Sequence, residues 1–436
     1  MHIFLIAYYF PPLGGAGVQR SLKLAKYLVK FGHHVTVLTV ENADYRVTDL
    51  SMLSECENMH IIRARHSIAK KNVKKELSRS ESGNKNNWVK CLIKSSIRSL
   101  KIIYYRYFIW YRFIPDRYIG WRKNAVELAL HFIQNNRIDI IISTSAPYTG
   151  HLVALDIKKV FTQIPWIADF RDPWVANHFT RIPFPVNQYH HFLEKSVVKN
   201  CDLLTTVSKP IADNFIQRYG KDTAIDVITN GYDEEDFKGF CNVKQPQKFV
   251  VMYNGTFYAD IRPDVFLKVY FSLIEADLIN KNDTNLVITG NYDDSKSILD
   301  NYQRKYSDVL ILDPFISHQN SIKKMEGAAA LLLIIDSKKN AEFIYTGKIF
   351  EYIRTGIPII ALVPNGVARD LINETQTGIC AFPNNESEIR EAILSAYAMW
   401  KNSASGLDIQ WNKIRCYTRE HLAKKFENCI KSLVNK

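Results

Sequence analysis

Residues 1–20 read MHIFLIAYYFPPLGGAGVQR, and this stretch indicates the fold class. Ile3–Tyr8 is an uninterrupted apolar run, which is typical of a strand buried on both faces. Two prolines and three glycines follow, and a helical pattern extends from about Val18 to Phe31. Because a buried strand, a glycine-rich turn and an amphipathic helix begin a β-α-β unit, we expect a parallel α/β sheet.

The same alternation continues along the chain. Strand candidates in the first half are Ile3–Tyr8, His34–Val40, Ile138–Ser143, Trp166–Asp169, Leu203–Val207 and Ile225–Thr229. A second series comprises Phe249–Asn254, Asn285–Thr289, Val309–Leu312, Ala330–Ile335, Ile357–Leu362 and Gly378–Ala381. Helical patterns lie between several of these runs. The sequence therefore predicts an α/β protein with two Rossmann-like, doubly wound parallel-sheet domains.

A polar turn separates the two series of strands. Thr229-Asn230-Gly231-Tyr232-Asp233 contains an Asn-Gly pair, which is a turn signal. We expect an N-terminal domain over residues 1–230, a linker over 231–247, a C-terminal domain over 248–412 and a final helix over 413–436. Open α/β sheets bind ligands beyond the carboxyl ends of their strands, so the two sheets should face a common cleft.

The composition excludes several classes of protein. Hydrophobic residues make up 47% of the 436-residue chain and charged residues 23%, which are ordinary globular values. Seven cysteines without a CxxC pair argue against a zinc cage or a disulfide framework and favour a reducing cytoplasm. No apolar run reaches roughly 18 residues, so we expect no transmembrane helix. The apolar N-terminus lacks the basic region of a signal peptide.

The glycine-rich turn is the first candidate site. Gly14, Gly15 and Gly17 precede a helix whose free N–H groups could approach a phosphate or a sugar. The alternative is a tight βα turn without a ligand. The dinucleotide fingerprint GxGxxG is not matched, because Arg20 stands at the position of its third glycine.

The second candidate is the start of a predicted helix at Thr346-Gly347-Lys348. Thr346 is suited to cap this helix, which leaves the backbone N–H groups of Gly347 and Lys348 for a diphosphate. Glu351 lies about one turn further on, where its carboxylate could accept hydrogen bonds from both ribose hydroxyls. A solvated glutamate that stabilises the helix start is the alternative.

The third candidate is Asp169-Phe170-Arg171-Asp172, at the end of a predicted strand. Two acids and a base at a strand end suit the recognition of hydroxyl groups, although a structural Asp–Arg pair would give the same pattern. The spacing differs from the DxD arrangement that holds a catalytic metal. The histidines show no metal-ligand spacing beside acids, so we expect no metal and no other cofactor.

Four short motifs follow one another along the chain. They are Pro11-Pro12-x-Gly14-Gly15, Ile228-Thr229-Asn230-Gly231-Tyr232-Asp233, Tyr253-Asn254-Gly255-Thr256-Phe257-Tyr258 and Gly347-Lys348-Ile349-Phe350-Glu351-Tyr352. This set, in this order, resembles the family-4 retaining glycosyltransferases, which have the GT-B fold. The resemblance covers the chain apart from about residues 45–125.

The resemblance implies an acceptor-side domain in residues 1–230 and a nucleotide-sugar donor domain in residues 248–412. It gives Arg262 the second position of the family's basic pair, whose first position is Thr256 here. Arg171 replaces the family's histidine, and Glu342 lies one residue before the family's sugar-contacting glutamate. The catalytic candidates are Arg262, Lys348, Arg171 and Asp172; the donor-binding candidates are Gly14, Gly15, Gly17, Gly255, Thr346, Gly347 and Glu351, with Glu342 as a possible sugar contact.

Positive charge is concentrated in one part of the chain. The net charge is +13, and residues 60–123 hold seventeen Lys or Arg and three acids. Within this basic insertion, Trp88–Ile114 combines an aromatic helical face with a stripe of Lys90, Lys94, Arg98 and Lys101. This pattern predicts an interfacial helix on an anionic membrane. A helix packed on the domain is the alternative, and nucleic acid is not expected because no recognised motif accompanies the charge.

Together these features and the resemblance predict a metal-independent hexosyltransferase that moves a sugar from a nucleotide-diphosphate sugar to an acceptor, and the resemblance implies retention. Arg262, Lys348 and a helix N-terminus would stabilise the leaving diphosphate. We expect a lipid-linked or cell-surface polysaccharide precursor, as in capsule or O-antigen synthesis, as the acceptor. The location would be the cytoplasm, peripheral to the inner face of the membrane. The alternatives are a nucleotide-sugar 2-epimerase of the same fold and a basic, non-catalytic RNA- or membrane-binding protein.

Overall fold

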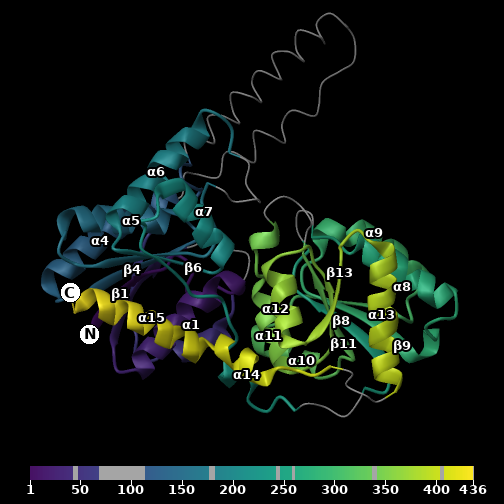
Figure 1. Ribbon diagram of the computed structural model, residues 1–436. Coiled ribbons are helices and arrows are strands. Elements are labelled where there is room, and N and C mark those ends of the chain that lie inside the picture. Colours follow the sequence, from purple (N-terminus) through teal and green to yellow (C-terminus); the bar gives the residue numbers. More distant parts are fainter. Residues whose placement is uncertain are drawn as a thin grey trace, which may run out of the picture.

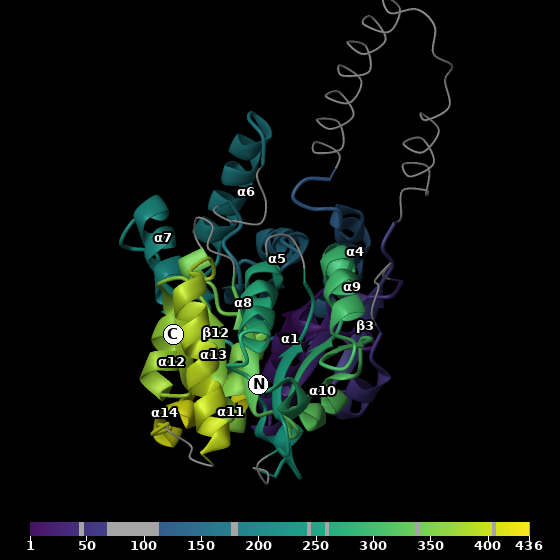
Figure 2. The same ribbon diagram turned by 90° about the vertical axis from the view of Figure 1, so that its right-hand side faces the viewer.

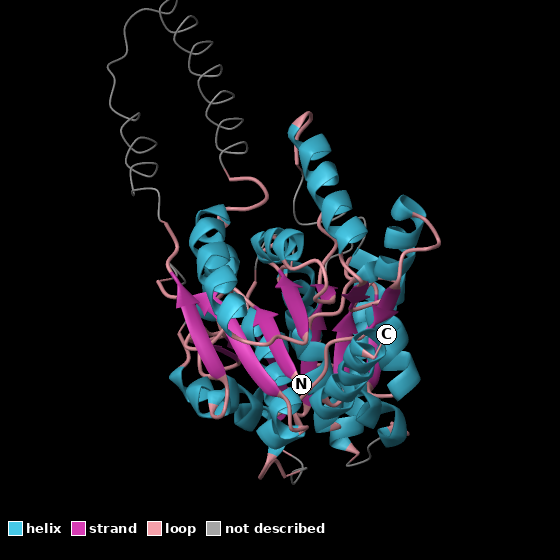
Figure 3. Ribbon diagram, turned by 90° about the vertical axis from the view of Figure 1, so that its left-hand side faces the viewer, coloured by secondary structure: helices cyan, strands magenta, loops and turns pink. Residues whose placement is uncertain are grey.

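The computed structural model describes residues 1–42, 48–67, 113–175, 182–241, 246–257, 261–335, 341–402 and 407–435. The chain forms two α/β domains that lie side by side, each with a parallel sheet covered by helices (Figures 1 and 3). The predicted fold class is therefore confirmed.

The N-terminal sheet has seven parallel strands in the order β3-β2-β1-β4-β5-β6-β7. Their bounds are β1 (His2–Ile6), β2 (His34–Val40), β3 (His60–Ala64), β4 (Ile140–Ser145), β5 (Trp166–Phe170), β6 (Leu203–Thr206) and β7 (Ile225–Val227). Because β1 pairs with both β2 and β4, the direction of winding reverses at β1. A reversal of this kind opens a crevice at the carboxyl ends of the strands, next to the glycine-rich turn.

The C-terminal sheet has six parallel strands in the order β10-β9-β8-β11-β12-β13. Their bounds are β8 (Phe249–Asn254), β9 (Thr284–Thr289), β10 (Leu310–Asp313), β11 (Ala330–Ile334), β12 (Ile359–Leu362) and β13 (Gly378–Ala381). Along β11, Ala330 and Leu332 belong to one buried cluster, and Leu331 and Leu333 belong to another. Successive side chains of a strand point to opposite faces, so both faces of this sheet are covered.

Helices supply the outer layers of both domains (Figure 3). In the N-terminal domain they are α1 (Ala16–Lys30), α4 (Arg122–Asn135), α5 (Thr149–Val160), α6 (Val186–Asn200) and α7 (Lys209–Tyr219). In the C-terminal domain they are α8 (Asp264–Glu275), α9 (Lys296–Lys305), α10 (His318–Met325), α11 (Gly347–Thr355), α12 (Val367–Thr375) and α13 (Glu386–Lys401). The buried residues of α8, α9 and α13 line one face of the C-terminal sheet, and those of α10, α11 and α12 line the other.

The end of the chain returns to the N-terminal domain. After the short helix α14 (Trp411–Ile414), α15 (Arg419–Val434) runs beneath that domain and packs along α1 (Figure 1). Its buried Leu422, Phe426 and Ile430 belong to the N-terminal core. The last helix therefore joins the domains a second time, beside the linker that contains the 3-10 turn Glu234–Phe237.

The stretch from 60 to 123 differs from the expected insertion at both of its ends. His60–Ala64 forms β3, an edge strand of the sheet, and Trp121 is fully buried in the core. Any membrane-facing segment therefore ends before Trp121. The predicted interfacial helix with Lys90, Lys94, Arg98 and Lys101 lies outside the described residues. Among those that the structure describes, no helix is long and apolar enough to span a membrane.

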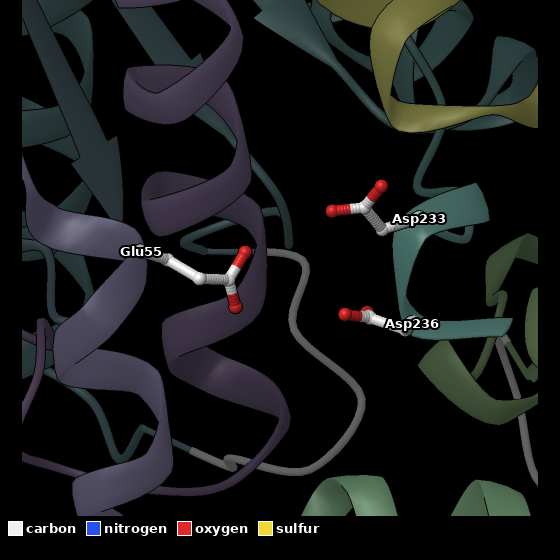
Figure 4. Close-up of side chains that lie close together, drawn as sticks. All are labelled: Glu55, Asp233 and Asp236. Atoms are coloured by element: carbon white, nitrogen blue, oxygen red, sulfur yellow. The ribbon is translucent and has the colours of Figure 1, made fainter. Parts of the chain in front are cut away.

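A buried lysine connects the N-terminal domain to the linker. The side chain of Lys23, on α1, is 1% exposed, and its Nζ lies 2.7 Å from Glu55, 2.8 Å from Asp233 and 2.7 Å from Asp236. Figure 4 shows the three carboxylates, with Glu55 approaching from the side opposite the two linker acids. Lys26 adds a second ammonium, 2.6 Å from Glu55 and 2.9 Å from Asp233. We call these five side chains the hinge cluster.

The charges of the hinge cluster shift the pKa of its members in opposite directions. Burial lowers the pKa of Lys23, but Asp236, Asp233 and Glu55 outweigh burial and raise it. Burial raises the pKa of Asp233, but Lys23 outweighs burial and lowers it. For Asp236, burial raises the pKa more than the charge of Lys23 lowers it, so the pKa is raised. The cluster is therefore a set of buried charges that depends on the central ammonium of Lys23.

Replacing Lys23 by Met is predicted to lower the free energy of unfolding by about 3–5 kcal/mol, because buried carboxylates would lose their central cation. Without Lys23 the folded-state pKa values of Asp233 and Asp236 rise, so the charged carboxylates destabilise the fold until they are protonated. The difference from wild type should therefore shrink as the pH falls from about 8 to about 5. Urea unfolding at several pH values measures both effects.

Lys30→Met is the matched control. Lys30 lies one turn after Lys26 on α1 and pairs with Glu235, but the two side chains are 43% and 35% exposed. An exposed pair of this kind contributes less than about 1 kcal/mol. Equal stability of the two variants at all pH values would contradict the structural role of Lys23.

Candidate functional site

The glycine-rich turn occupies the carboxyl end of β1. Gly15 is the N-cap residue of α1 and has a φ of 89°, a backbone conformation that side chains other than glycine rarely adopt. At Gly17, an added Cβ would lie 3.5 Å from the ring of Tyr9. The turn thus brings backbone, rather than side chains, to the carboxyl ends of the strands.

Arg171 holds this turn in place. Its guanidinium donates to the backbone carbonyl of Gly17 at 2.7 Å and to that of Ala146 at 2.8 Å, and it also donates to the carbonyl of Ser145. Burial lowers the pKa of Arg171, and Asp172 and Asp169 oppose that effect. Three of the five N–H donors of the side chain are therefore used to join the turn to the end of β4.

Asp169 forms a structural ion pair, but its partner is not Arg171. The carboxylate receives two hydrogen bonds from Arg20, at 2.9 and 2.7 Å, and others from Thr144 and Thr205. Arg20 also donates to the carbonyls of Ile228 and Thr229, which lead into the linker. Arg20, at the third-glycine position of the fingerprint, thereby connects α1, β5 and the linker. Asp172 lies beyond the strand end and is partly exposed.

On the C-terminal side, the site is formed by the loop after β8 and the start of α11. Gly255 has a φ of 145°, and a Cβ added there would lie 2.5 Å from Nζ of Lys348. Only glycine leaves room for the lysine to lie against the loop. Thr346 is the N-cap residue of α11, but its hydroxyl makes no capping bond and is buried without a partner in the described residues. Gly347 is the first residue of the helix.

Lys348 is held over an aromatic ring. Its Nζ lies 3.9 Å from the ring centroid of Tyr253, which stacks on Phe257 with centroids 4.2 Å apart. Burial lowers the pKa of Lys348 to about 7, although Glu351 opposes the shift. No hydrogen bond or ion pair joins the lysine to a described residue, so the Tyr253 ring and the more distant Glu351 are the neighbours that favour its charge.

Glu351 lies one turn after Lys348, so the two side chains share a face of α11. Its Oε1 lies 2.8 Å from Nε2 of His318, the first residue of α10. The other ring nitrogen of His318 lies 3.9 Å from Oδ2 of Asp236. The Glu351 side chain is 23% exposed, so it remains accessible to a ligand.

Glu342 belongs to a short 3-10 turn, Ala341–Phe343, that leads into α11. The turn packs tightly on Gly366, the N-cap residue of α12, where a Cβ would lie 2.3 Å from the carbonyl oxygen of Glu342. From the N-terminal domain, the hydroxyl of Ser208 donates to the carbonyl of Phe343 at 2.9 Å. This turn therefore contacts both domains.

Arg262 lies at the edge of this arrangement. Its guanidinium forms a bidentate pair with Asp264, at 2.9 and 3.0 Å, and the two side chains are 48% and 38% exposed. The cation is therefore already shared with a carboxylate before any diphosphate approaches. Lys348 has no such partner in the described residues, which makes it the more available cation.

The three acids in Figure 4 also have the composition of a metal site. Oxygens of Glu55, Asp233 and Asp236 all lie within 4.8 Å of one another. The ammonium of Lys23, however, is within 2.8 Å of all three carboxylates. A cation is thus already supplied by the chain, and the cluster serves as an ion-pair network.

The structure brings together Gly255, Thr346, Gly347, Lys348 and Glu351 at the start of α11. It places Gly14, Gly15, Gly17 and Arg171 at the turn after β1. Sequence reasoning missed His318, Ser208 and Lys23. The position of His318 carried a usable signal, because it starts the helix after β10 and so lies at the same edge of the sheet as Glu351.

Residues 93–236 match the model of Glycosyltransferase Family 4. No curated protein sequence matches the chain at a significant level. Solved structures do. Sucrose-phosphate synthase from Thermosynechococcus elongatus has a TM-score of 0.65 at 13% identity, covering 100% of this chain and 99% of that one.

Two other solved structures extend the likeness. Anabaena HepE in complex with UDP and glucose has a TM-score of 0.65 at 12% identity, covering 99% of this chain and 100% of its own. WaaG, a glycosyltransferase involved in lipopolysaccharide biosynthesis, has a TM-score of 0.59 at 13% identity, covering 99% of both chains. The fold implied by the four motifs is thereby confirmed: the chain as a whole has the GT-B fold, and residues 93–236 match the family-4 glycosyltransferase model.

Proposed function

We propose that the protein transfers a sugar from a nucleotide-diphosphate sugar to an acceptor hydroxyl. The observation that carries the proposal is the arrangement at the start of α11, where Lys348 and Glu351 share one face beside the glycine loop at Gly255. An ammonium, free backbone N–H groups and a carboxylate one turn apart suit a diphosphate followed by a ribose. Anabaena HepE was solved with UDP and glucose, which supports a nucleotide-sugar donor here.

The donor domain would act mainly on the leaving group. When the bond between the sugar and the diphosphate breaks, negative charge develops on the phosphate oxygens. Lys348 and the N-terminus of α11 would stabilise this charge, with Gly347 allowing close approach of the backbone. Arg262 would contribute after release from Asp264. The reaction proposed here is metal-independent, because these groups supply positive charge of their own.

The acceptor would bind beside the turn at Gly14, Gly15 and Gly17. Its hydroxyl forms the new bond to the sugar, and its proton passes to the departing phosphate, so that the product keeps the donor's stereochemistry. Arg171 would then act by fixing the turn, whereas Asp172 and Glu342 would contact sugar hydroxyls. Hexosyl transfer to a lipid-linked or surface-polysaccharide precursor is the form of the reaction that we propose.

Donor breakdown tests this function directly. The purified protein is incubated with a panel of UDP-, GDP- and ADP-sugars, with and without lipid-linked glycan acceptors. We expect one donor to release nucleoside diphosphate slowly alone and faster with acceptor. Conversion of the donor to a second nucleotide sugar would indicate a 2-epimerase instead. No nucleotide-sugar binding at all would favour a non-catalytic protein.

Glu351→Ala should weaken nucleotide binding by about 1–3 kcal/mol, because the ribose hydroxyls would lose their charged acceptor. Isothermal titration calorimetry with the nucleoside diphosphate of the active donor measures the change. Glu391→Ala is the control, since Glu391 is exposed on α13. An affinity equal to wild type in the Glu351 variant would refute the ribose contact.

The lowered pKa of Lys348 predicts a pH profile. The lysine is charged below its pKa of about 7 and neutral above it, so kcat/KM should fall as the pH rises through this value. The Lys348→Met variant should lose most of its activity, and its kcat/KM should no longer fall as the pH rises through about 7. The Lys348→Arg variant should keep the positive charge, and the fall of kcat/KM should occur at higher pH.

Lys323→Met, on the exposed side of α10, is the control for the loss of one positive charge. Chelators should leave the wild-type rate unchanged throughout the pH range. A rate that EDTA abolishes and added magnesium or manganese restores would overturn the metal-independent mechanism. A wild-type profile that stays flat well above the pKa would remove Lys348 from its role.

We further propose that the N-terminal domain attaches to an anionic membrane. The described residues on α6 and just before it add support. Phe184, which precedes the helix, and Tyr189 and Phe192 on it are 67%, 50% and 61% exposed, respectively, and the last two rings stack 6.1 Å apart. Lys195 and Lys199 are exposed further along the same helix. Aromatic rings beside lysines are typical of a surface that meets lipid headgroups. The protein would then lie on the cytoplasmic face of the membrane.

Reversing Lys90, Lys94, Arg98 and Lys101 to Glu should release the protein from anionic vesicles while donor hydrolysis continues. Each basic residue near an anionic surface contributes about 1 kcal/mol, so four reversals should abolish binding. Co-sedimentation with phosphatidylglycerol vesicles, at low and high salt, measures the effect.

Four exposed lysines of the C-terminal half provide the control, namely Lys296, Lys323, Lys401 and Lys413. Their reversal changes the net charge equally but should leave vesicle binding intact. Tyr189→Ser combined with Phe192→Ser should weaken binding without any change in charge. If both charge variants release the protein equally, the attraction is nonspecific and the proposed surface is wrong.

A further inference from the structure

The carboxylate of Glu351 has a fixed neighbour on another element. Nε2 of His318 lies 2.8 Å from Oε1 of Glu351, and the two side chains are 19% and 23% exposed. His318 is the first residue of α10, and the side chain of the preceding Ser317 caps that helix through Asn320. The start of the helix, and with it the ring of His318, is therefore held in a defined place.

The opposite edge of the ring faces the hinge cluster. Nδ1 of His318 lies 3.9 Å from Oδ2 of Asp236, and Asp236 lies 2.7 Å from Nζ of Lys23. Burial alone would lower the pKa of His318, but Glu351 and then Asp236 outweigh burial and raise it. Lys23 is the cation that opposes them. The ring thus lies between two carboxylates, each facing one of its nitrogens.

This arrangement limits the freedom of Glu351. A glutamate on the surface of a helix samples several rotamers, and ordering them costs free energy when a ligand binds. A hydrogen bond to Oε1 fixes the carboxylate plane and leaves Oε2 and the remaining lone pair of Oε1 for the ligand.

We propose that His318 is a positioning residue, which holds the Glu351 carboxylate in the orientation that receives the ribose of the nucleotide. The proposal rests on the proposed role of Glu351. His318 acts through Glu351 and does not itself contact the nucleotide. Asp236, in the interdomain linker, holds the other edge of the histidine ring.

A double-mutant cycle tests this role. The probes are UDP, GDP and ADP, and the one that binds wild type most tightly is used for calorimetry. His318→Leu should weaken binding about tenfold, whereas His318→Gln, whose amide can still donate to Glu351, should stay within about threefold of wild type. In the Glu351→Ala background, His318→Leu should have no further effect, because the group that it positions is gone.

His421→Leu is the control, since His421 is exposed on α15. Thermal unfolding confirms that each variant is folded. Wild-type affinity in His318→Leu would overturn the proposal. An equal loss in the presence and in the absence of Glu351 would also overturn it, because His318 would then act on the nucleotide directly or on the fold.

The same experiment separates this proposal from the proposed function. If none of the three nucleotides binds wild type, both fail. If a nucleotide binds and Glu351→Ala leaves its affinity unchanged, the ribose contact fails while nucleotide binding stands. If Glu351→Ala weakens binding and His318→Leu does not, only the positioning role fails.

Discussion

The ammonium of Lys23 is the interaction on which the relation between the two domains depends. It is 1% exposed and joins Glu55 of the N-terminal domain to Asp233 and Asp236 of the linker (Figure 4). Buried carboxylates need cations close by, so Lys23 and Lys26 hold the linker acids against α1. Because the linker precedes β8 in the chain, the position of the C-terminal domain depends on a lysine of the N-terminal domain.

The same constraint extends to the site. Asp236 of the hinge cluster faces His318, and His318 bonds to Glu351 on α11. Arg20 makes the second connection, from Asp169 at the end of β5 to the carbonyls before the linker. The groups proposed to bind donor and acceptor therefore share supports near the hinge. A bilobed enzyme needs this arrangement, since its two substrates must meet in one geometry although different domains hold them.

Local sequence predicted the fold because buried parallel strands are apolar along their whole length. The bounds of β2, β8 and β13 agree with the predicted runs. The strand β3 was missed because its sequence, His-Ile-Ile-Arg-Ala, is that of a polar edge strand. The return of α15 to the first domain was also not predicted, because its apolar face is compatible with packing on either domain. Amphipathicity shows that a helix is buried on one side but not against what.

The residues of the candidate site also fall into those that local sequence predicts and those that it does not. Glycines and a helix start are local signals, and they indicated the turn at Gly15 and the start of the helix at Gly347, whereas the loop at Gly255 was indicated by the family resemblance. Partners far apart in the chain carry no such signal. The structural Asp–Arg pair that was the alternative for this stretch forms between Asp169 and Arg20, across 149 residues, and Arg171 instead bonds to backbone carbonyls. Burial and topology determine which of several arginines pairs with Asp169, and the local pattern of residue types does not reveal it.

Lys348 shows how such a site is prepared for its ligand. A lysine in the first turn of a helix is opposed by the helix dipole, and burial removes water from its charge. Both effects destabilise the ammonium, and the ring of Tyr253 replaces only part of the lost solvation. The unpaired hydroxyl of Thr346 adds a buried polar group without a partner in the described residues. Protein sequences rarely keep local conflicts of this kind except where a ligand resolves them. An anion at the start of α11 would satisfy the ammonium, the helix N-terminus and the hydroxyl together, so the electrostatics of this helix start support the proposed diphosphate site.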